Sequence, residues 1–77
     1  MNVTIYTTES CPWCKKTKEF FREHKIKFNE KDVGRDSKAA KEMIQKSRQQ
    51  GVPVIDVDGE IVIGFNEEKL RGVLKLR

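Results

Sequence analysis

The 77-residue sequence predicts an α/β fold, with a four-stranded mixed sheet flanked by three helices in the order βαβαββα. Two patterns carry this prediction. Near the N-terminus a β-rich segment leads directly into a helical segment and then a second β-rich one, which favours a right-handed crossover between parallel strands. Near the C-terminus two apolar segments flank an Asp58-Gly59 turn, which indicates an antiparallel hairpin. We expect residues 1–77 to form a single domain, because a chain of this length builds one core.

The first strand and helix are predicted on either side of the only two cysteines. Val3–Thr7 is rich in β-branched residues and ends in polar ones, as strands do. From Pro12 the pattern becomes helical, and Ser10 or Cys11 can serve as its N-cap. Proline fits the first turn, since its missing N–H would have no helical partner there. Three apolar side chains then lie among lysines and glutamates: Trp13, Phe20 and Phe21.

A second strand and helix follow. Apolar residues in Ile26–Val33 alternate with polar ones, which predicts a strand across that whole segment. Gly34 then offers a turn, and Asp36 or Ser37 an N-cap. The predicted core-facing stripe of the second helix is spaced i, i+3, i+4, i+7: Ala40, Met43, Ile44 and Ser47.

The last three elements are a hairpin and a short helix. Val52–Val57 and Glu60–Phe65 are the two strands joined at Asp58-Gly59. Asn66 can cap the final helix, whose first turn carries acidic residues that suit the positive end of the helix dipole. Its apolar stripe consists of Leu70, Val73 and Leu74.

Composition and charge exclude several classes of protein. The net charge is +4, but basic and acidic residues are interleaved from residue 15 to residue 71, so no nucleic-acid partner is expected. No apolar run approaches the ~18 residues needed to span a membrane, and the N-terminus lacks signal-peptide features. A single close cysteine pair indicates a reducing compartment. We therefore expect a cytoplasmic monomer that acts on neither nucleic acid nor membranes.

Cys11 and Cys14 admit three interpretations. A closed zinc site needs about four ligands, and His24 is the only other Cys or His in the chain. A structural disulfide closing so short a loop would remove little chain entropy. The third interpretation is a chemical reagent. A helix N-terminus favours an anion, so we expect a Cys11 thiolate with its pKa lowered into the range of about 3.5–7.5 found in such motifs. Lys15 and Lys16 add positive charge nearby.

The two sulfurs are expected to have different tasks. Cys14, one turn further into the helix, should be more sheltered and less nucleophilic than Cys11. Cys11 would attack a substrate disulfide, and Cys14 would then resolve the mixed disulfide.

Three motifs together resemble a glutaredoxin-like thiol-disulfide redoxin, and the resemblance covers essentially the whole chain. They are Cys11-Pro12-Trp13-Cys14, Gly51-Val52-Pro53 and Gly64-Phe65. The resemblance implies a thioredoxin fold and a redox-active Cys11–Cys14 disulfide, with no bound cofactor or metal. It also implies disulfide-containing protein substrates, and electrons from glutathione or a thioredoxin-reductase-like flavoprotein.

The resemblance also implies substrate-binding roles. In this family the proline matching Pro53 is cis and faces the sulfurs, and the backbone of Val52 would pair with an extended substrate; from the residues alone, Pro53 would be an ordinary trans proline at a strand start. Pro12 is expected to stiffen the loop between the sulfurs. Trp13, beside an exposed nucleophile, is expected on the rim of the site rather than in the core.

Further residues distinguish between the two possible electron donors, glutathione and a flavoprotein reductase. Gly64 and Phe65 resemble the Gly-Phe of redoxins that serve ribonucleotide reductase and are recharged by thioredoxin reductase, whereas glutathione-using members usually show Gly-Gly followed by Asp. Phe65 has an alternative role as a hydrophobic contact at the start of the last helix. Thr8 stands where both branches commonly place a Lys or Arg. The apolar Ile5 stands where thioredoxins proper carry a buried acid.

Two binding functions compete with the redox reading. Some glutaredoxins bridge an iron-sulfur cluster between two chains, with one cysteine from each chain plus glutathione. The Cys11–Cys14 pair could alternatively carry a soft ion such as Cu(I), which prefers thiolate ligands.

Overall fold

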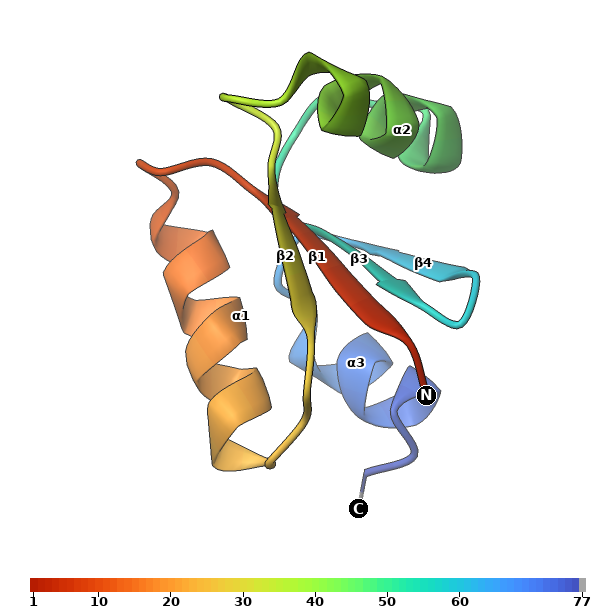
Figure 1. Cartoon of the computed structure of the whole chain (residues 1–77). Coiled ribbons are helices and arrows are strands. Elements are labelled where there is room, and N and C mark those ends of the chain that lie inside the picture. Colours follow the sequence, from red (N-terminus) through yellow and green to blue (C-terminus); the bar gives the residue numbers. More distant parts are fainter. Residues whose placement is uncertain (77) are drawn as a thin grey trace.

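The computed structural model describes residues 1–76 and confirms the predicted fold class and element order. Its elements are β1 (Val3–Thr7), α1 (Pro12–Glu23), β2 (Asn29–Asp32), α2 (Ser37–Ser47), β3 (Val54–Val57), β4 (Glu60–Ile63) and α3 (Glu67–Val73) (Figure 1). The sheet has the strand order β2-β1-β3-β4. β1 and β2 are parallel, whereas β1 with β3 and β3 with β4 are antiparallel.

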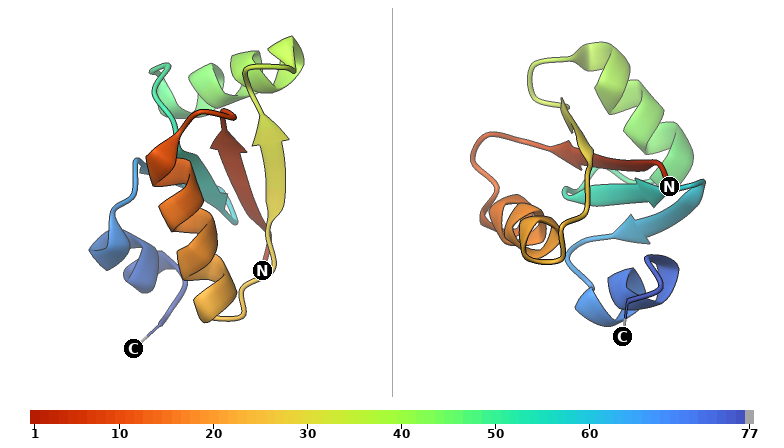
Figure 2. Two further views of the ribbon diagram at one scale, coloured as in Figure 1. Left: turned by 90° about the vertical axis from the view of Figure 1, so that its left-hand side faces the viewer. Right: turned by 60° about the horizontal axis from the view of Figure 1, so that its bottom comes forward.

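The helices cover both faces of the sheet. α1 and α3 lie on one face and α2 on the other (Figure 2). The larger core fills the first side: Val3, Ile5, Phe20, Phe21, Ile55, Val57, Val62, Leu70 and Leu74. On the α2 side the fully buried Tyr6 packs with Met43 and Val54. No helix within residues 1–76 has both the length and the apolar character needed to cross a bilayer.

The predicted caps and turn form as the local sequence requires. Cys11, Asp36 and Asn66 are the N-caps of the three helices, each with its side chain accepting a backbone N–H of the first turn. At the β3–β4 turn Asp58 has φ 50° and Gly59 φ 93°. Positive φ at both central residues is the geometry of the two-residue hairpin turn that Asp-Gly favours.

The prediction for β2 was too long. The strand covers Asn29–Asp32, not Ile26–Val33. Lys25 adopts φ 56°, and the Ile26 N–H donates to the Phe21 carbonyl at 2.8 Å, so this residue closes the end of α1 instead of joining the sheet. Ile26 and Phe28 still pack against the larger core. Apolar alternation over this segment therefore marked burial but not strand pairing.

The predicted face of α2 was also rotated. Ala39 and Met43 are the buried residues of the helix, whereas Ile44 is 38% exposed. Successive residues lie about 100° apart around a helix. Ile44 therefore lies on the flank of the helix, partly exposed, when Met43 points toward the sheet.

A polar network fixes the rotation of α2. The Tyr6 hydroxyl donates to Glu42 at 2.6 Å and accepts from Lys46 at 2.9 Å. Lys46 also pairs with Asp56 of β3 at 2.7 Å, and Glu42 with Lys31 of β2 at 2.7 Å. These bonds hold the flank of α2 that carries Glu42 and Lys46 against three strands.

Tyr6→Phe is expected to lower the free energy of unfolding at pH 7 by about 1–2 kcal/mol, because two hydrogen bonds to charged partners are lost at a buried position. Urea denaturation of the variant and of the original protein measures this difference.

The pH dependence of the effect follows from Glu42. The hydrogen bond from Lys31, followed by that from Tyr6, lowers the pKa of Glu42 to about 2. The ionised carboxylate thus stabilises the fold above its unfolded pKa of about 4.3, and this contribution fades as the pH falls toward 2. The difference in free energy of unfolding between Tyr6→Phe and the original protein should therefore narrow as the pH falls from about 4.3 toward 2. Equal stability of the two proteins at pH 7 would contradict the role of the network.

Candidate active site

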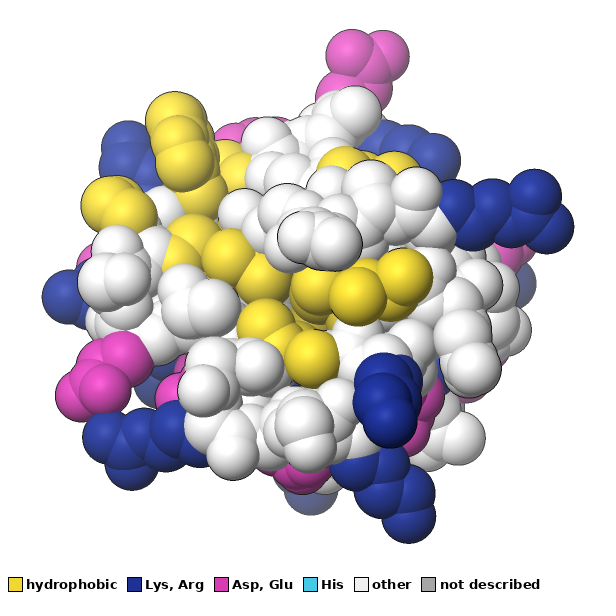
Figure 3. Space-filling model, turned by 90° about the horizontal axis from the view of Figure 1, so that it is seen from above, with side chains coloured by type: hydrophobic (Ala, Val, Ile, Leu, Met, Phe, Trp, Pro, Cys, Tyr) yellow, Lys and Arg dark blue, Asp and Glu magenta, His cyan; other side chains and the backbone are white. Residues whose placement is uncertain are grey.

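The predicted site residues come from segments that meet at one end of the sheet. In the strand register Tyr6 is opposite Val54, and Val54 is opposite Ile63. The loop after β1, the Val52-Pro53 segment before β3 and the Gly64-Phe65 segment after β4 therefore share this end. Seen from this end, hydrophobic side chains gather in the middle of the surface, and charged side chains project at its edges (Figure 3).

Cys11 and Cys14 form a disulfide across the first turn of α1, with Cα atoms 5.2 Å apart. Cys11 is the N-cap and Pro12 occupies the first turn, as predicted. Cys11 is 9% exposed and Cys14 is 1% exposed. The predicted difference in shelter is therefore confirmed: both cysteines are buried, and Cys14 is covered more completely than Cys11.

The helix start supplies the electrostatics expected for a thiolate at Cys11. The Cys14 backbone N–H donates to the Cys11 Sγ at 3.0 Å. No acidic residue lies in the first turn of α1. A thiolate at this sulfur would accept that hydrogen bond and interact favourably with the positive end of the helix dipole. The geometry therefore favours Cys11 as the anionic sulfur of the pair.

A cavity of about 270 Å³ lies beside the disulfide, lined by both cysteines, Thr7 and Thr8. Its remaining walls carry three basic and three acidic residues: Lys15, Lys18, Arg35, Glu9, Glu30 and Asp32. Of the two lysines predicted to add positive charge, Lys15 lines this cavity. Lys16 instead lies with its Nζ 5.5 Å from the Trp13 ring centroid.

Sequence reasoning missed Glu30. Its carboxylate accepts hydrogen bonds from the Thr7 hydroxyl at 2.8 Å and from Lys18 Nζ at 2.9 Å. The bond from Lys18 is the main cause of a lowered Glu30 pKa. Glu30 is the ladder partner of Ile5, the apolar position where thioredoxins proper carry an acid. The sequence does contain a signal for this residue. If the first two predicted strands are paired in parallel, the side chain of Glu30 lies on the same face of the sheet as that of Ile5, which is the face covered by α1.

Val52 and Pro53 lie directly before β3, and the peptide bond between them is cis. The Pro53 side chain is fully buried, and its carbonyl accepts the Gly64 N–H at 2.8 Å. Gly64 has φ 75°, a conformation that favours glycine. This bond links the segments before β3 and after β4. Substrate pairing by the Val52 backbone stays a prediction.

Trp13 and Phe65 form an aromatic contact beside the cysteines. Their ring centroids are 6.3 Å apart with an interplanar angle of 28°. Trp13 is 56% exposed, which confirms its place on the rim. Phe65 is half-buried and also packs edge-on against Phe20, with centroids 5.9 Å apart. Phe65 thus makes the hydrophobic contact predicted for it while supporting the exposed indole.

His24 lies at the opposite end of α1, where its Nδ1 is 2.9 Å from the Phe20 carbonyl oxygen. It is therefore remote from the sulfurs, as predicted. Within residues 1–76, no three His, Cys, Asp or Glu side chains are grouped so that they could hold a metal ion.

Comparisons with known proteins agree with this geometry. The family model described as Glutaredoxin matches residues 3–62. The chain is 47% identical over 68 residues to an uncharacterized glutaredoxin-like 8.6 kDa protein in a rubredoxin operon of Clostridium pasteurianum, covering 88% of this chain and 91% of that protein. It is 31% identical over 68 residues to the glutaredoxin-like protein NrdH of Lactococcus lactis, covering 88% and 93% of the two chains.

The fold has equally clear structural relatives. A crystal structure of a mutant of the thioredoxin-like protein BC3987 matches with a TM-score of 0.93 and 30% sequence identity, covering 99% of this chain and 97% of that one. The expected thioredoxin-like architecture is therefore confirmed. A family model over most of the chain and a 47% identical relative show that the chain belongs to the glutaredoxin family of thiol-disulfide oxidoreductases.

Proposed function

We propose that this protein reduces disulfides of other proteins in the cytoplasm, as a monomer, through the Cys11–Cys14 dithiol. The observation that carries this proposal is the asymmetry of the pair. Cys11 caps a helix and accepts a backbone N–H, whereas Cys14 is almost completely buried behind it. Such an arrangement suits one attacking and one resolving sulfur. The close pair without further cysteines supports a reducing compartment.

The reaction proceeds in two exchanges. The Cys11 thiolate attacks one sulfur of a substrate disulfide, forming a Cys11–substrate disulfide and releasing the other substrate sulfur as a thiolate, which takes a proton. Cys14 then loses its proton and attacks the Cys11 sulfur, which forms the Cys11–Cys14 disulfide and releases the second substrate thiol. Two electrons thus pass from the dithiol to the substrate, and a separate donor returns them.

The surroundings of the sulfurs suggest how a protein substrate is held. The exposed Trp13 ring, supported by Phe65, offers a flat apolar surface next to Cys11. We infer that the substrate segment lies against this ring and pairs with the Val52 backbone, in the manner of an added strand. Pro12, Pro53 and Gly64 shape the loops that carry these groups.

We infer that the donor is a flavoprotein of the thioredoxin-reductase type rather than glutathione. Thr8 lines the cavity beside the sulfurs, at the position where a Lys or Arg would help to hold the glutathione carboxylate. Gly64-Phe65 stands where glutathione-using members usually show Gly-Gly followed closely by Asp. A solved NrdH-redoxin of Escherichia coli is described as having a thioredoxin-like activity profile, and its structure matches this chain with a TM-score of 0.83, which supports the same inference.

Reduction of the oxidised protein by NADPH and thioredoxin reductase is expected to be at least about tenfold faster than by millimolar glutathione. A missing charge-assisted hydrogen bond to glutathione is sufficient for a factor of this size. Stopped-flow tryptophan fluorescence, with acid quenching and alkylation, measures both rates. Thr8→Lys should raise the glutathione rate selectively. Equal rates in the unaltered protein would overturn the donor assignment.

A further inference from the structure

We propose that Glu30 is a positioning residue that keeps Cys11 less acidic, and the cysteine pair more reducing, than the helix N-terminus alone would make them. It does so by holding the Lys18 ammonium and by adding its own negative charge to the cavity beside the sulfurs. This inference rests on the proposed role of Cys11 as the attacking thiolate, and it assigns a function to a carboxylate that the exchange reaction does not itself use.

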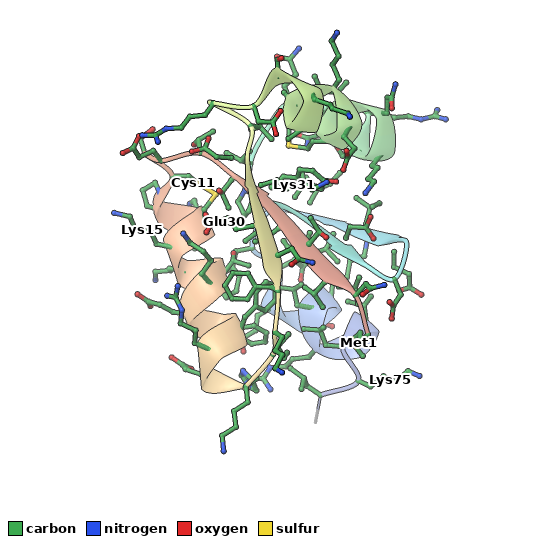
Figure 4. The ribbon with its side chains drawn as sticks, in the orientation of Figure 1. Met1, Cys11, Lys15, Glu30, Lys31 and Lys75 are labelled. Atoms are coloured by element: carbon green, nitrogen blue, oxygen red, sulfur yellow. A yellow bond between two sulfur atoms is a disulfide. The ribbon has the colours of Figure 1, made fainter. Side chains whose placement is uncertain are left out.

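The placement of Glu30 is fixed from two sides. The Thr7 hydroxyl is buried at the end of β1 and donates to Glu30 at 2.8 Å. Lys18 from α1 donates to the same Oε2 atom at 2.9 Å. Figure 4 shows Glu30 on the side of the sheet that carries Cys11, whereas Lys31, the next residue, lies on the α2 side and pairs there with Glu42. Glu30 is therefore directed toward the cysteines by the alternation of β2 and by two hydrogen bonds.

The other charges around the cavity are paired differently. Arg35 lies 3.0 Å from Glu9 and 3.9 Å from Asp32, with its own side chain and that of Glu9 largely exposed. Lys15 Nζ has no carboxylate within ion-pair distance in the part of the chain that the structure describes. The Lys18–Glu30 pair is less exposed than the Arg35–Glu9 pair. Water therefore screens its charges less.

The sign of each effect follows from Coulomb interactions with a Cys11 thiolate. Lys18 stabilises the thiolate, and Glu30 opposes it while also restraining Lys18. Stabilising the thiolate lowers the thiol pKa and favours the reduced form, which makes the pair more oxidising. Removing Glu30 should thus lower the Cys11 pKa and make the pair more oxidising. Removing Lys18 should raise this pKa and make the pair more reducing.

Glu30→Gln is expected to lower the Cys11 pKa by about half a unit, and Lys18→Gln to raise it by a similar amount, as partly screened charges do across a small cavity. Above the Cys11 pKa, half a unit corresponds to about threefold in the equilibrium between dithiol and disulfide. The dithiol should be favoured in Glu30→Gln and the disulfide in Lys18→Gln. The double variant should return to within about twofold of the original protein.

The pH dependence of iodoacetamide alkylation of the reduced protein measures the pKa, and equilibration in graded glutathione buffers measures the redox equilibrium. Glu60→Gln and Lys75→Gln are the matched controls, because they make the same charge changes away from the cavity. They should change neither the Cys11 pKa nor the redox equilibrium. Lys75 lies at the far end of the molecule from Cys11 (Figure 4). A purely structural role would move both cavity variants in the same direction. Shifts of the same sign, or none, would overturn the proposal.

Mass spectrometry of the alkylated protein separates this proposal from the proposed function. Alkylation first at Cys14, or no disulfide in any buffer, would remove the premise that Cys11 is the attacking sulfur. First alkylation at Cys11, with unchanged pKa values in both cavity variants, would overturn the role of Glu30 alone. Thermal unfolding monitored by circular dichroism confirms that each variant is folded when its pKa is measured.

Discussion

Cys11→Ser is expected to reduce the rate of protein-disulfide reduction by at least about a thousandfold, to the uncatalysed background. A serine hydroxyl is not ionised near neutral pH and forms no disulfide, so the first exchange has no attacking group. Mixing the reduced variant with a disulfide-containing protein and following the appearance of substrate thiols measures the loss.

The substitution has a built-in control for folding. Cys11 is the N-cap of α1, and its side chain accepts the Cys14 N–H. Serine is among the preferred N-cap residues, so the helix start should be retained or strengthened. A folded, inactive variant therefore reports on chemistry alone. Full activity in this variant, together with its loss in Cys14→Ser, would instead make Cys14 the attacking sulfur.

Local patterns were sufficient to predict most of the fold. The Asp58-Gly59 turn, the N-caps Cys11, Asp36 and Asn66, and the helical spacing after Pro12 each act over a few residues. These local signals fix the order of strands and helices. A parallel crossover followed by a hairpin then combines into one mixed sheet, so few other topologies are possible. The cysteine asymmetry was equally predictable, because one helical turn separates the N-cap from the covered sulfur.

The features that sequence reasoning missed depend on contacts between distant segments. α2 is rotated so that Glu42 and Lys46 reach Tyr6, a preference that hydrophobic spacing alone does not contain. Ile26 satisfies its N–H at the end of α1 and so leaves the strand. Glu30 joins the site because β2 pairs in register with β1, and a charged residue in an edge strand resembles any solvated position.

Cys14→Ser is expected to convert the protein into a trap for its substrates. Cys11 can still attack, but the sulfur that would release the mixed disulfide is absent. Incubation of the reduced variant with excess disulfide-containing protein should give close to one covalent adduct per chain. The original protein should retain at most a few per cent, because Cys14 lies one helical turn from Cys11, with Cα atoms 5.2 Å apart, and resolution is intramolecular.

Non-reducing electrophoresis and mass spectrometry measure the adduct, and added dithiothreitol should release it. The variant lacking both cysteines is the matched control and should form none. Cys11 is the only cysteine left in this variant, so the yield of the adduct reports directly on attack by the sulfur that caps the helix. A variant that forms no adduct, yet still reduces substrate at the original rate, would show that release does not require Cys14. The pair would then operate through one sulfur and an external thiol, and the burial of Cys14 would require a different explanation.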